Sequence, residues 1–159
     1  MPPASHFRWA SEADNGRLGE IMFDSVRNGD SPYSQAQRAA WVGAPPSGEA
    51  WAAKLALQDV IVAERDGEPV GFMTLAGGGY IDLAFIRPGA RHTGLFRQLL
   101  SRIVERALAK GEPRLWTHAS LSAEPAFAAH GFAVVRRERV RVGDQELDRC
   151  EMERRLAGA

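Results

Sequence analysis

The residues that could carry chemistry gather between Ala84 and Phe96, where an apolar strand-like segment runs into a long helical pattern. The first N–H groups of a helix have no partner inside it, and with the helix dipole they form a binding site for anions such as a pyrophosphate. Gly94 permits close approach of the backbone, and Arg91 can add a charge-assisted contact. An ordinary strand-to-helix connection has the same order, so the pattern alone leaves both interpretations open.

The hydrophobic period predicts the elements that position this loop. Apolar residues recur at helical spacing from Gly94 to Leu108, which is the clearest helix of the chain. Further helices are predicted after the Ser11-x-x-Asp14 cap and at residues 34–41, 49–57 and 125–130. Strands are predicted at residues 6–10, 60–64, 69–75, 80–86, 114–119, 132–142 and 145–156. This order indicates an α/β layer protein with a largely antiparallel sheet.

Length and composition fit one soluble domain that spans residues 1–159. The 20 basic and 20 acidic side chains cancel, which removes the global electrostatic argument for a nucleic-acid partner. Cys150 is the only cysteine, so neither an intrachain disulfide nor a cysteine-based metal cluster is expected. No apolar run resembles a signal peptide or a membrane helix. We therefore expect a cytoplasmic protein with no metal, membrane or nucleic-acid partner.

The loop resembles the pyrophosphate loop of the GNAT superfamily of acyl-CoA-dependent N-acyltransferases, which reads Arg/Gln-x-x-Gly-x-Gly/Ala. This chain has Arg91-x-x-Gly94-x-Phe96 after a strand and Pro88. The later segment 126–132 looks like the helix-to-strand segment of the family, Phe-Tyr-Glu-Lys-Leu-Gly-Phe. The resemblance implies a GNAT fold: a central, mostly antiparallel twisted sheet of about six to seven strands flanked by helices.

The resemblance begins at about Asp59 and continues to the C-terminus. Residues 79–83 and 116–120 look like the small bacterial YafP-type branch of the superfamily. The helices that precede residue 59 match the family in arrangement only.

Acetyl-CoA is the acyl donor that the resemblance implies. Backbone groups of Phe85 and Ile86 would pair with the pantetheine arm as if it were an extra strand. Ser120 stands where many members have an asparagine that contacts the cofactor, and Phe127 where many have a tyrosine that protonates the leaving thiolate. The expected cofactor-binding residues are Phe85, Ile86, Arg91, His92, Thr93, Gly94, Leu95, Phe96, Ser120 and Phe127.

Two of these residues depart from the family pattern. Phe96 replaces a small residue, and its ring either crowds the helix start or points into the core. Phe127 cannot donate a proton, so the usual acid is missing. Its loss is tolerable in principle, because a thiolate whose thiol has a pKa of about 8.5 can leave unprotonated.

Two residues are candidates for the base at the reacting amine, and a third is a candidate for the acid at the leaving thiolate. Asp82 is the first choice, because Tyr80, Asp82 and Ala84 would alternate on one face of the strand that meets the acyl group. His118 lies on a neighbouring strand, and histidine titrates near neutral pH. Tyr80 could replace the missing phenol. Each of the three could instead be an ordinary packed or hydrogen-bonded side chain.

These observations predict direct transfer of an acetyl group from acetyl-CoA to a primary amine of a small molecule or peptide. Tyr33 and Trp41 are the expected acceptor contacts, because they lie in the N-terminal helices that cover the acceptor pocket in this family. A non-catalytic acyl-CoA-binding or sensing module is the alternative, which Phe127 slightly favours. The sequence specifies neither the acceptor nor the oligomeric state, although homodimers are common in the superfamily.

Overall fold

The computed structural model describes residues 4–156, which contain eight strands and five α-helices. The strands are β1 (Ser5–Trp9), β2 (Asp59–Arg65), β3 (Glu68–Leu75), β4 (Tyr80–Ile81), β5 (Ala84–Ile86), β6 (Arg114–Ser120), β7 (Ala133–Val142) and β8 (Gln145–Arg155). The helices are α1 (Asn15–Arg27), α2 (Gln35–Trp41), α3 (Gly48–Ala56), α4 (Leu95–Ala109) and α5 (Glu124–Ala129). Every predicted element is present near its expected bounds, except that the strand predicted at residues 80–86 is interrupted.

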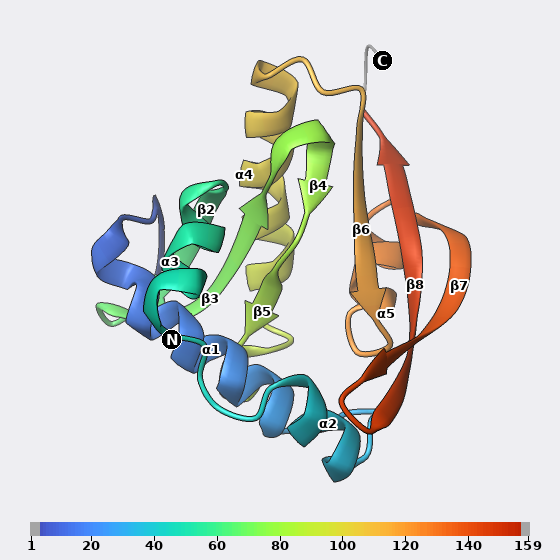
Figure 1. Ribbon diagram of the computed structural model, residues 1–159. Helices are drawn as coiled ribbons and strands as arrows, with labels where there is room; N and C mark the ends of the chain where they lie inside the picture. Colours follow the sequence, from blue (N-terminus) through green and yellow to red (C-terminus); the bar gives the residue numbers. More distant parts are fainter. Residues whose placement is uncertain (1–3, 157–159) are drawn as a thin grey trace.

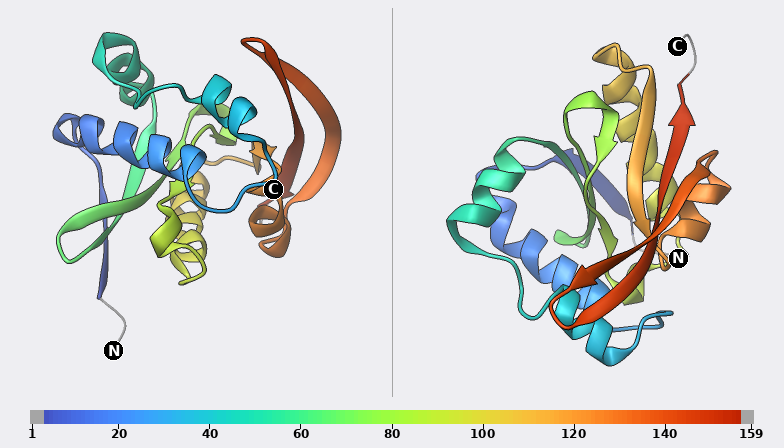
Figure 2. Two further views of the ribbon diagram at one scale, coloured as in Figure 1. Left: turned by 90° about the horizontal axis from the view of Figure 1, so that it is seen from below. Right: turned by 45° about the vertical axis from the view of Figure 1, so that its right-hand side comes forward.

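The strands form two four-stranded sheets, in the orders β1-β2-β3-β5 and β4-β6-β8-β7 (Figure 1). Neighbouring strands are antiparallel, apart from β4 and β6, which run parallel. Helices α1 and α3 contact the first sheet on the side opposite α4 (Figure 2). Within residues 4–156, no helix combines the length and apolar character needed to cross a bilayer. The predicted α/β fold is confirmed, with its sheet divided into two.

The division falls within the strand that was predicted at residues 80–86. β4 pairs with Trp116 and Thr117 of β6, whereas β5 pairs with residues 71–73 of β3. Asp82 and Leu83 lie between them and belong to neither strand. One segment of chain thus crosses from the second sheet to the first. β5 and the end of β6 therefore diverge, as Figure 1 shows.

Two clusters of buried side chains hold the layers together. The larger cluster packs α4 against both sheets, and the predicted apolar stripe of α4 supplies Leu99, Leu100 and Ile103, each at most 2% exposed. The smaller cluster lies under α1 and α3 and includes Leu18 and Trp51. Leu108, which was assigned to the stripe of α4, is 45% exposed at the end of the helix. The core thus fixes α4 and α1 on either side of the point where the strands diverge.

Candidate functional site

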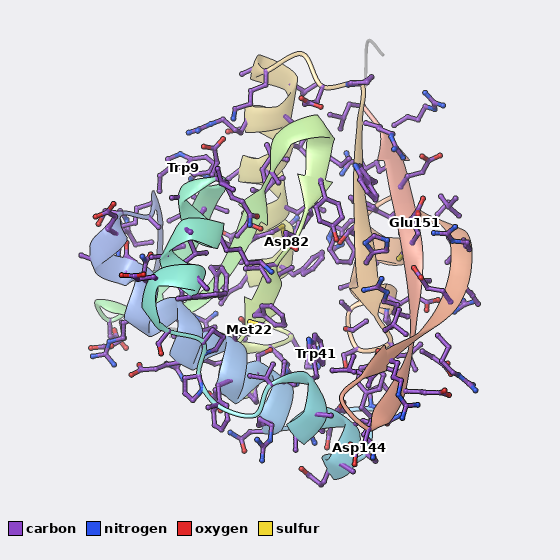
Figure 3. The ribbon with its side chains drawn as sticks, in the orientation of Figure 1. Trp9, Met22, Trp41, Asp82, Asp144 and Glu151 are labelled. Carbon is purple, nitrogen blue, oxygen red and sulfur yellow. The ribbon has the colours of Figure 1, made fainter. Side chains whose placement is uncertain are left out.

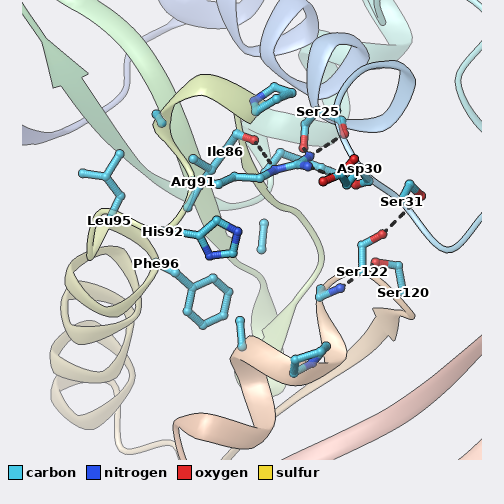
Figure 4. Close-up of a pocket in the computed structure, with 18 of the residues that line it drawn as sticks. Ser25, Asp30, Ser31, Ile86, Arg91, His92, Leu95, Phe96, Ser120 and Ser122 are labelled. Carbon is cyan, nitrogen blue, oxygen red and sulfur yellow. Dashed lines mark hydrogen bonds between the residues drawn. The ribbon is translucent and has the colours of Figure 1, made fainter.

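A pocket of about 1000 Å³ lies where the two sheets diverge (Figure 4). Its walls come from β5, the connection from β6 to α5, the loop after α1 and the N-terminal end of α4. Residues on these walls include Ala84, Ile86, Gly94, Phe96, Ser120 and Ser122. An elongated ligand could therefore contact a strand edge and a helix terminus at the same time.

β5 presents one unpaired edge to this pocket. The C=O of Leu83 and the N–H of Arg87 both hydrogen-bond to β3, at 2.9 and 2.8 Å. Backbone groups of an antiparallel strand alternate between its two edges, so those of Phe85 also face β3. Those of Ala84 and Ile86 face the opposite way, toward β6. The backbone groups that can pair with a ligand at this edge are therefore those of Ala84 and Ile86, and not those of Phe85 as predicted. Phe85 nevertheless lines the pocket.

Ser120 stands across the pocket from β5, at the end of β6. Its hydroxyl oxygen accepts a hydrogen bond from the N–H of Ala123 at 3.1 Å. The hydroxyl proton remains free to point toward a ligand, because a serine hydroxyl both donates and accepts. The sequence placed Ser120 at a cofactor contact, and it does lie on the pocket wall.

The N-terminal end of α4 carries unpaired donors toward the pocket. Gly94 caps the helix at φ +84°, a conformation that favours glycine, and no side chain among residues 4–156 caps the helix. His92, Leu95 and Phe96 line the pocket beside it. Thr93 was also predicted here, but its hydroxyl donates to the Ala90 carbonyl at 2.6 Å and Thr93 does not line the pocket. The loop therefore offers backbone N–H groups to an anion.

Arg91 makes contacts that its family position does not suggest. Its guanidinium donates to the carbonyl of Ser25 at 2.6 Å and to those of Asp30 and Ile86 at 3.4 Å (Figure 4). Burial, together with the positive charge of Arg38, lowers the pKa of Arg91. The side chain thus ties the loop before α4 to the end of α1, although it also borders the pocket. Its hydrogen bonds in the structure are made within the chain, and the charge-assisted contact that it could add to a bound pyrophosphate stays a prediction.

Phe96 and Phe127 pack together. The rings meet edge to face with centroids 5.0 Å apart, and Phe127 also lies 4.9 Å from the ring of Phe132. Phe127 is 1% exposed and belongs to the core, so it is absent from the pocket wall. Of the two predicted positions for the Phe96 ring, the structure shows the one that packs against the core. Phe96 also borders the pocket. Phe127 thus lies in the core behind the pocket wall, and its expected contact with the cofactor stays a prediction.

Tyr80 and His118, two candidates for proton transfer, are brought together by the parallel pairing of β4 with β6. The Tyr80 hydroxyl lies 2.8 Å from Nδ1 of His118. Both side chains point to the face opposite the buried Ile81 and Thr117, and the Tyr80 ring packs on Trp116 with centroids 4.4 Å apart. Burial, and then the negative charge of Asp82, raises the pKa of Tyr80. Tyr80 is therefore a neutral phenol that is hydrogen-bonded to an imidazole.

Asp82 has a different environment. Its carboxylate accepts a hydrogen bond from Gln58 at 3.0 Å and lies 3.4 Å from Nζ of Lys54. Since β4 ends before Asp82, the predicted alternation of Tyr80, Asp82 and Ala84 on one strand face is wrong. Figure 3 shows Asp82 at this break in the strand.

Sequence reasoning missed two carboxylates beside His118. Nε2 of His118 lies 3.7 Å from Glu138 and 4.0 Å from Glu151, which stand on β7 and β8. Glu151 is labelled in Figure 3. The antiparallel register of β6 with β8 places Glu151 directly opposite His118, and only that register could have revealed the cluster. In the described part of the chain, no group of three or more histidine, cysteine, aspartate or glutamate side chains is arranged to hold a metal ion.

The two expected acceptor contacts differ in their roles. The Tyr33 hydroxyl donates to the carbonyl of Asp148 at 2.6 Å and accepts from the N–H of Leu121 at 2.9 Å, and Tyr33 is 6% exposed. It therefore ties the loop before α2 to β8 and to the end of β6. Trp41 does line the pocket, with its ring 6.1 Å from that of Phe85.

Comparison with known proteins identifies the family. Residues 30–152 match the model of the acetyltransferase (GNAT) domain. The chain belongs to the GNAT acetyltransferase family. YafP of Escherichia coli K12, described as an uncharacterized N-acetyltransferase, is 36% identical over 108 residues, which cover 68% of this chain and 67% of YafP. As a GNAT protein the chain is an acetyl-CoA-dependent acyltransferase, as predicted.

Solved structures have the same GNAT fold. A GCN5-related N-acetyltransferase from Rhodopseudomonas palustris matches with a TM-score of 0.88 and 26% identity, covering 98% of this chain and 99% of that one. The Salmonella typhimurium protein YncA, solved with its cofactor acetyl-CoA, matches with a TM-score of 0.69 and 22% identity, covering 98% and 96%. The second likeness concerns the fold alone.

Proposed function

We propose that this GNAT protein transfers the acetyl group of acetyl-CoA directly to a primary amine of a small molecule or peptide. The observation that carries the proposal is the meeting of an unpaired strand edge and an uncapped helix N-terminus in one pocket. Pantetheine has amide groups that can pair with a strand edge, and pyrophosphate suits a helix N-terminus. YncA, of the same fold, was solved with acetyl-CoA.

Each part of the donor has a proposed partner in the chain. The backbone groups of Ala84 and Ile86 pair with the pantetheine arm, and the Ser120 hydroxyl contacts it from the opposite wall. The N–H groups at the start of α4, from Leu95 and Phe96, bind the pyrophosphate, with His92 beside it. These assignments keep the predicted cofactor site but exclude Thr93 and Phe127 from direct contact.

Acetyl-CoA supplies the acyl group as a thioester, and the chain supplies the groups that handle charge. The N–H of Ala84 faces the pocket and is the donor placed to stabilise an oxyanion. Tyr80, through its hydrogen bond to His118, is the group that takes the proton from the attacking amine. Asp82 is already bound to Lys54 and Gln58, so it is not the base. Its carboxylate can instead orient the amine.

A non-catalytic acyl-CoA sensor is the second candidate, and one observation favours it. Phe127 occupies the position of the acid that the family resemblance implies, and it is buried in the core. Such a sensor would bind the donor stoichiometrically and acetylate no amine. Donor binding is common to both candidates, so turnover separates them.

A thermal melt with and without saturating acetyl-CoA, followed by a screen of primary amines for free thiol release, tests the proposal. Ligand at about 100 times its dissociation constant adds roughly 2.7 kcal/mol to the stability. In a chain of this size that raises the melting temperature by about 5–10 °C. A shift with turnover supports the enzyme, and a shift without turnover over a broad amine panel supports the sensor. No shift at millimolar ligand contradicts both.

A further inference from the structure

The C-terminal hairpin brackets the imidazole of His118 with two carboxylates. We propose that Glu138 and Glu151 are positioning residues, which hold the neutral ring with its proton on Nε2 so that Nδ1 can accept the proton of Tyr80. The inference rests on the proposed acetyl transfer. It assigns to β7 and β8 a part in the reaction, although neither carboxylate borders the cofactor pocket.

The geometry around the ring selects this tautomer. A carboxylate only accepts hydrogen bonds, and both carboxylates lie on the Nε2 side, at 3.7 and 4.0 Å. The favourable partner for them is a protonated Nε2. The Nδ1 lone pair then faces the Tyr80 hydroxyl at 2.8 Å, and the hydroxyl donates to it. With the proton on Nδ1 instead, two carboxylates would face a lone pair.

Strand register builds the cluster and keeps the carboxylates in place. Glu151 is paired with His118 across β8 and β6, and Glu138 is paired with Arg149 across β7 and β8. Arg136 lies 3.4 Å from Glu151, and Arg149 lies 3.5 Å from Glu138. Each carboxylate thus lies between a guanidinium and the imidazole, which holds it beside Nε2 of His118.

One atom of the cluster indicates that it does more than pack. Oε1 of Glu138 is buried and has no hydrogen-bond partner among the described residues. Its nearest side-chain nitrogens are Nε of Arg149 at 3.5 Å, which also lacks a hydrogen-bond partner among the described residues, and Nε2 of His118 at 3.7 Å. An unsatisfied buried carboxylate oxygen is costly, and a proton or positive charge on the ring reduces that cost. The site is therefore most stable when His118 carries a proton on Nε2.

The proton of the attacking amine moves through Tyr80 to His118. As the amine nitrogen bonds to the acyl carbon, the carbon–sulfur bond breaks and coenzyme A leaves as its thiolate, which keeps the electron pair of that bond. The amine proton passes to the Tyr80 oxygen. The proton of Tyr80 passes to Nδ1 of His118, which becomes an imidazolium. The charged groups that face this pair are Glu138 on β7, Glu151 and Arg149 on β8, and Asp82 at the strand break. The carboxylates stabilise the imidazolium, and the proton then returns to solvent.

Nitrogen NMR of the histidine rings tests the tautomer without any need for activity. In protein labelled with ¹⁵N-histidine, the His118 signals are assigned by their loss in His118→Asn. We expect the neutral ring to be protonated on Nε2. In the double variant Glu138→Gln/Glu151→Gln, whose amides can donate to Nε2, part of the population should shift to Nδ1. Glu153→Gln, on the same strand and paired with Arg114, is the matched control and should change nothing.

Steady-state kinetics with one amine throughout test the catalytic consequence. Glu138→Gln and Glu151→Gln should each lower kcat about tenfold and leave the KM for acetyl-CoA unchanged, because removing a nearby anion withdraws stabilisation from the imidazolium that forms during proton transfer. Acetyl-CoA affinity should not change.

Protonation of the wild-type ring on Nδ1, or a tautomer that the double variant leaves unchanged, overturns the proposal even if the enzyme acetylates amines. The proposal is also overturned if Glu138→Gln and Glu151→Gln show the same kinetics as the control Glu153→Gln. Failure to find any acceptor would contradict the transfer reaction, while the NMR result would still decide whether the carboxylates set the tautomer.

Discussion

Tyr80 and Arg91 both act through neighbours that their sequence positions do not reveal. The phenol of Tyr80 reaches the imidazole of His118, which lies on a different strand. The guanidinium of Arg91 reaches the carbonyl of Ser25 near the end of α1, 66 positions away in the chain. At the scale of single residues, the proposed chemistry therefore depends on one long-range hydrogen bond, and the shape of the pocket depends on another.

Tyr80→Phe removes the hydroxyl and leaves the ring packed on Trp116. We expect kcat to fall by about a hundredfold, because acid–base groups typically contribute at least that much. The melting temperature and the affinity for acetyl-CoA should change little, since Tyr80 does not line the donor pocket. Steady-state kinetics with a thermal melt and a binding titration check this. A fully active Tyr80→Phe enzyme would remove Tyr80 from the proton path.

Arg91→Ala should destabilise the protein even without ligand, contrary to a residue that serves only the cofactor. It leaves the carbonyls of Ser25, Asp30 and Ile86 without their guanidinium donor. Hydrogen bonds to charged groups contribute about 1.5–3 kcal/mol, so the melting temperature should fall by roughly 3–10 °C. Arg97→Ala, an exposed substitution on the same pocket wall, is the control and should leave the unliganded melt unchanged. Equal melts for the two variants would mark Arg91 as a cofactor residue alone.

At the scale of elements, the spacing of apolar residues predicted helices and strands correctly wherever one face of the element is buried. The stripe of α4 and the strands from β2 to β3 follow it, because one face of each must be apolar. Residues 80–86 look like one strand because they are mostly apolar and are bounded by turn residues on both sides. The backbone nevertheless changes sheets at Asp82. Pairing partners are set by tertiary register, and no local pattern encodes them.

The same limit applies to the candidate site. The loop from Arg91 to Phe96 was identifiable because helix termini and glycine have local signatures. The contacts of His118 with Tyr80 and Glu151 depend on which strands lie side by side. The sequence could therefore suggest Tyr80 and His118 as candidates, but not that they are hydrogen-bonded or that Glu151 lies beside them. Burial of Phe127 likewise follows from the packing of α5 against its surroundings, and its sequence position suggested a site contact instead.

An ion pair between β1 and the start of α1 gives the stability a defined pH dependence. Asp14 accepts two hydrogen bonds from Arg8, at 2.8 and 2.9 Å, and one from the N–H of Ser11. The Arg8 hydrogen bonds, followed by that of Ser11, lower the pKa of Asp14. A carboxyl whose pKa is lower in the folded state stabilises the protein above its unfolded pKa, about 3.9, and that stability is lost as the pH falls further.

Asp14→Asn should therefore lower the free energy of unfolding near neutral pH by about 1–3 kcal/mol. The difference from wild type should shrink as the pH falls below about 4, because the carboxyl of the unfolded chain then takes up a proton that the folded protein binds only at lower pH. Urea unfolding between about pH 2 and pH 7 measures both effects. Glu20→Gln, which breaks an exposed pair with Arg17, is the control and should change neither. A constant difference across this pH range would contradict the linkage.

At the scale of the whole molecule, two sheets share one interrupted segment and one helix. β4 and β5 carry the chain from the second sheet to the first, and α4 packs beneath the junction. The pocket occupies the space where a continuous sheet would have its next hydrogen bonds, between β5 and the end of β6. In the proposed binding mode, a pantetheine arm would complete the sheet here and would couple the two halves through backbone hydrogen bonds.

Amide hydrogen exchange makes this coupling measurable at three adjacent residues. Acetyl-CoA should slow exchange at Ala84 and Ile86, whose N–H groups face the pocket, by at least about fivefold, the equivalent of one hydrogen bond of about 1 kcal/mol. Phe85 already faces β3 and should change least. ADP, which has the pyrophosphate without the pantetheine arm, should leave all three amides unaffected. Slowing at Phe85 alone would mean that the opposite edge of β5 meets the donor, and the oxyanion contact would then have to move from Ala84 as well.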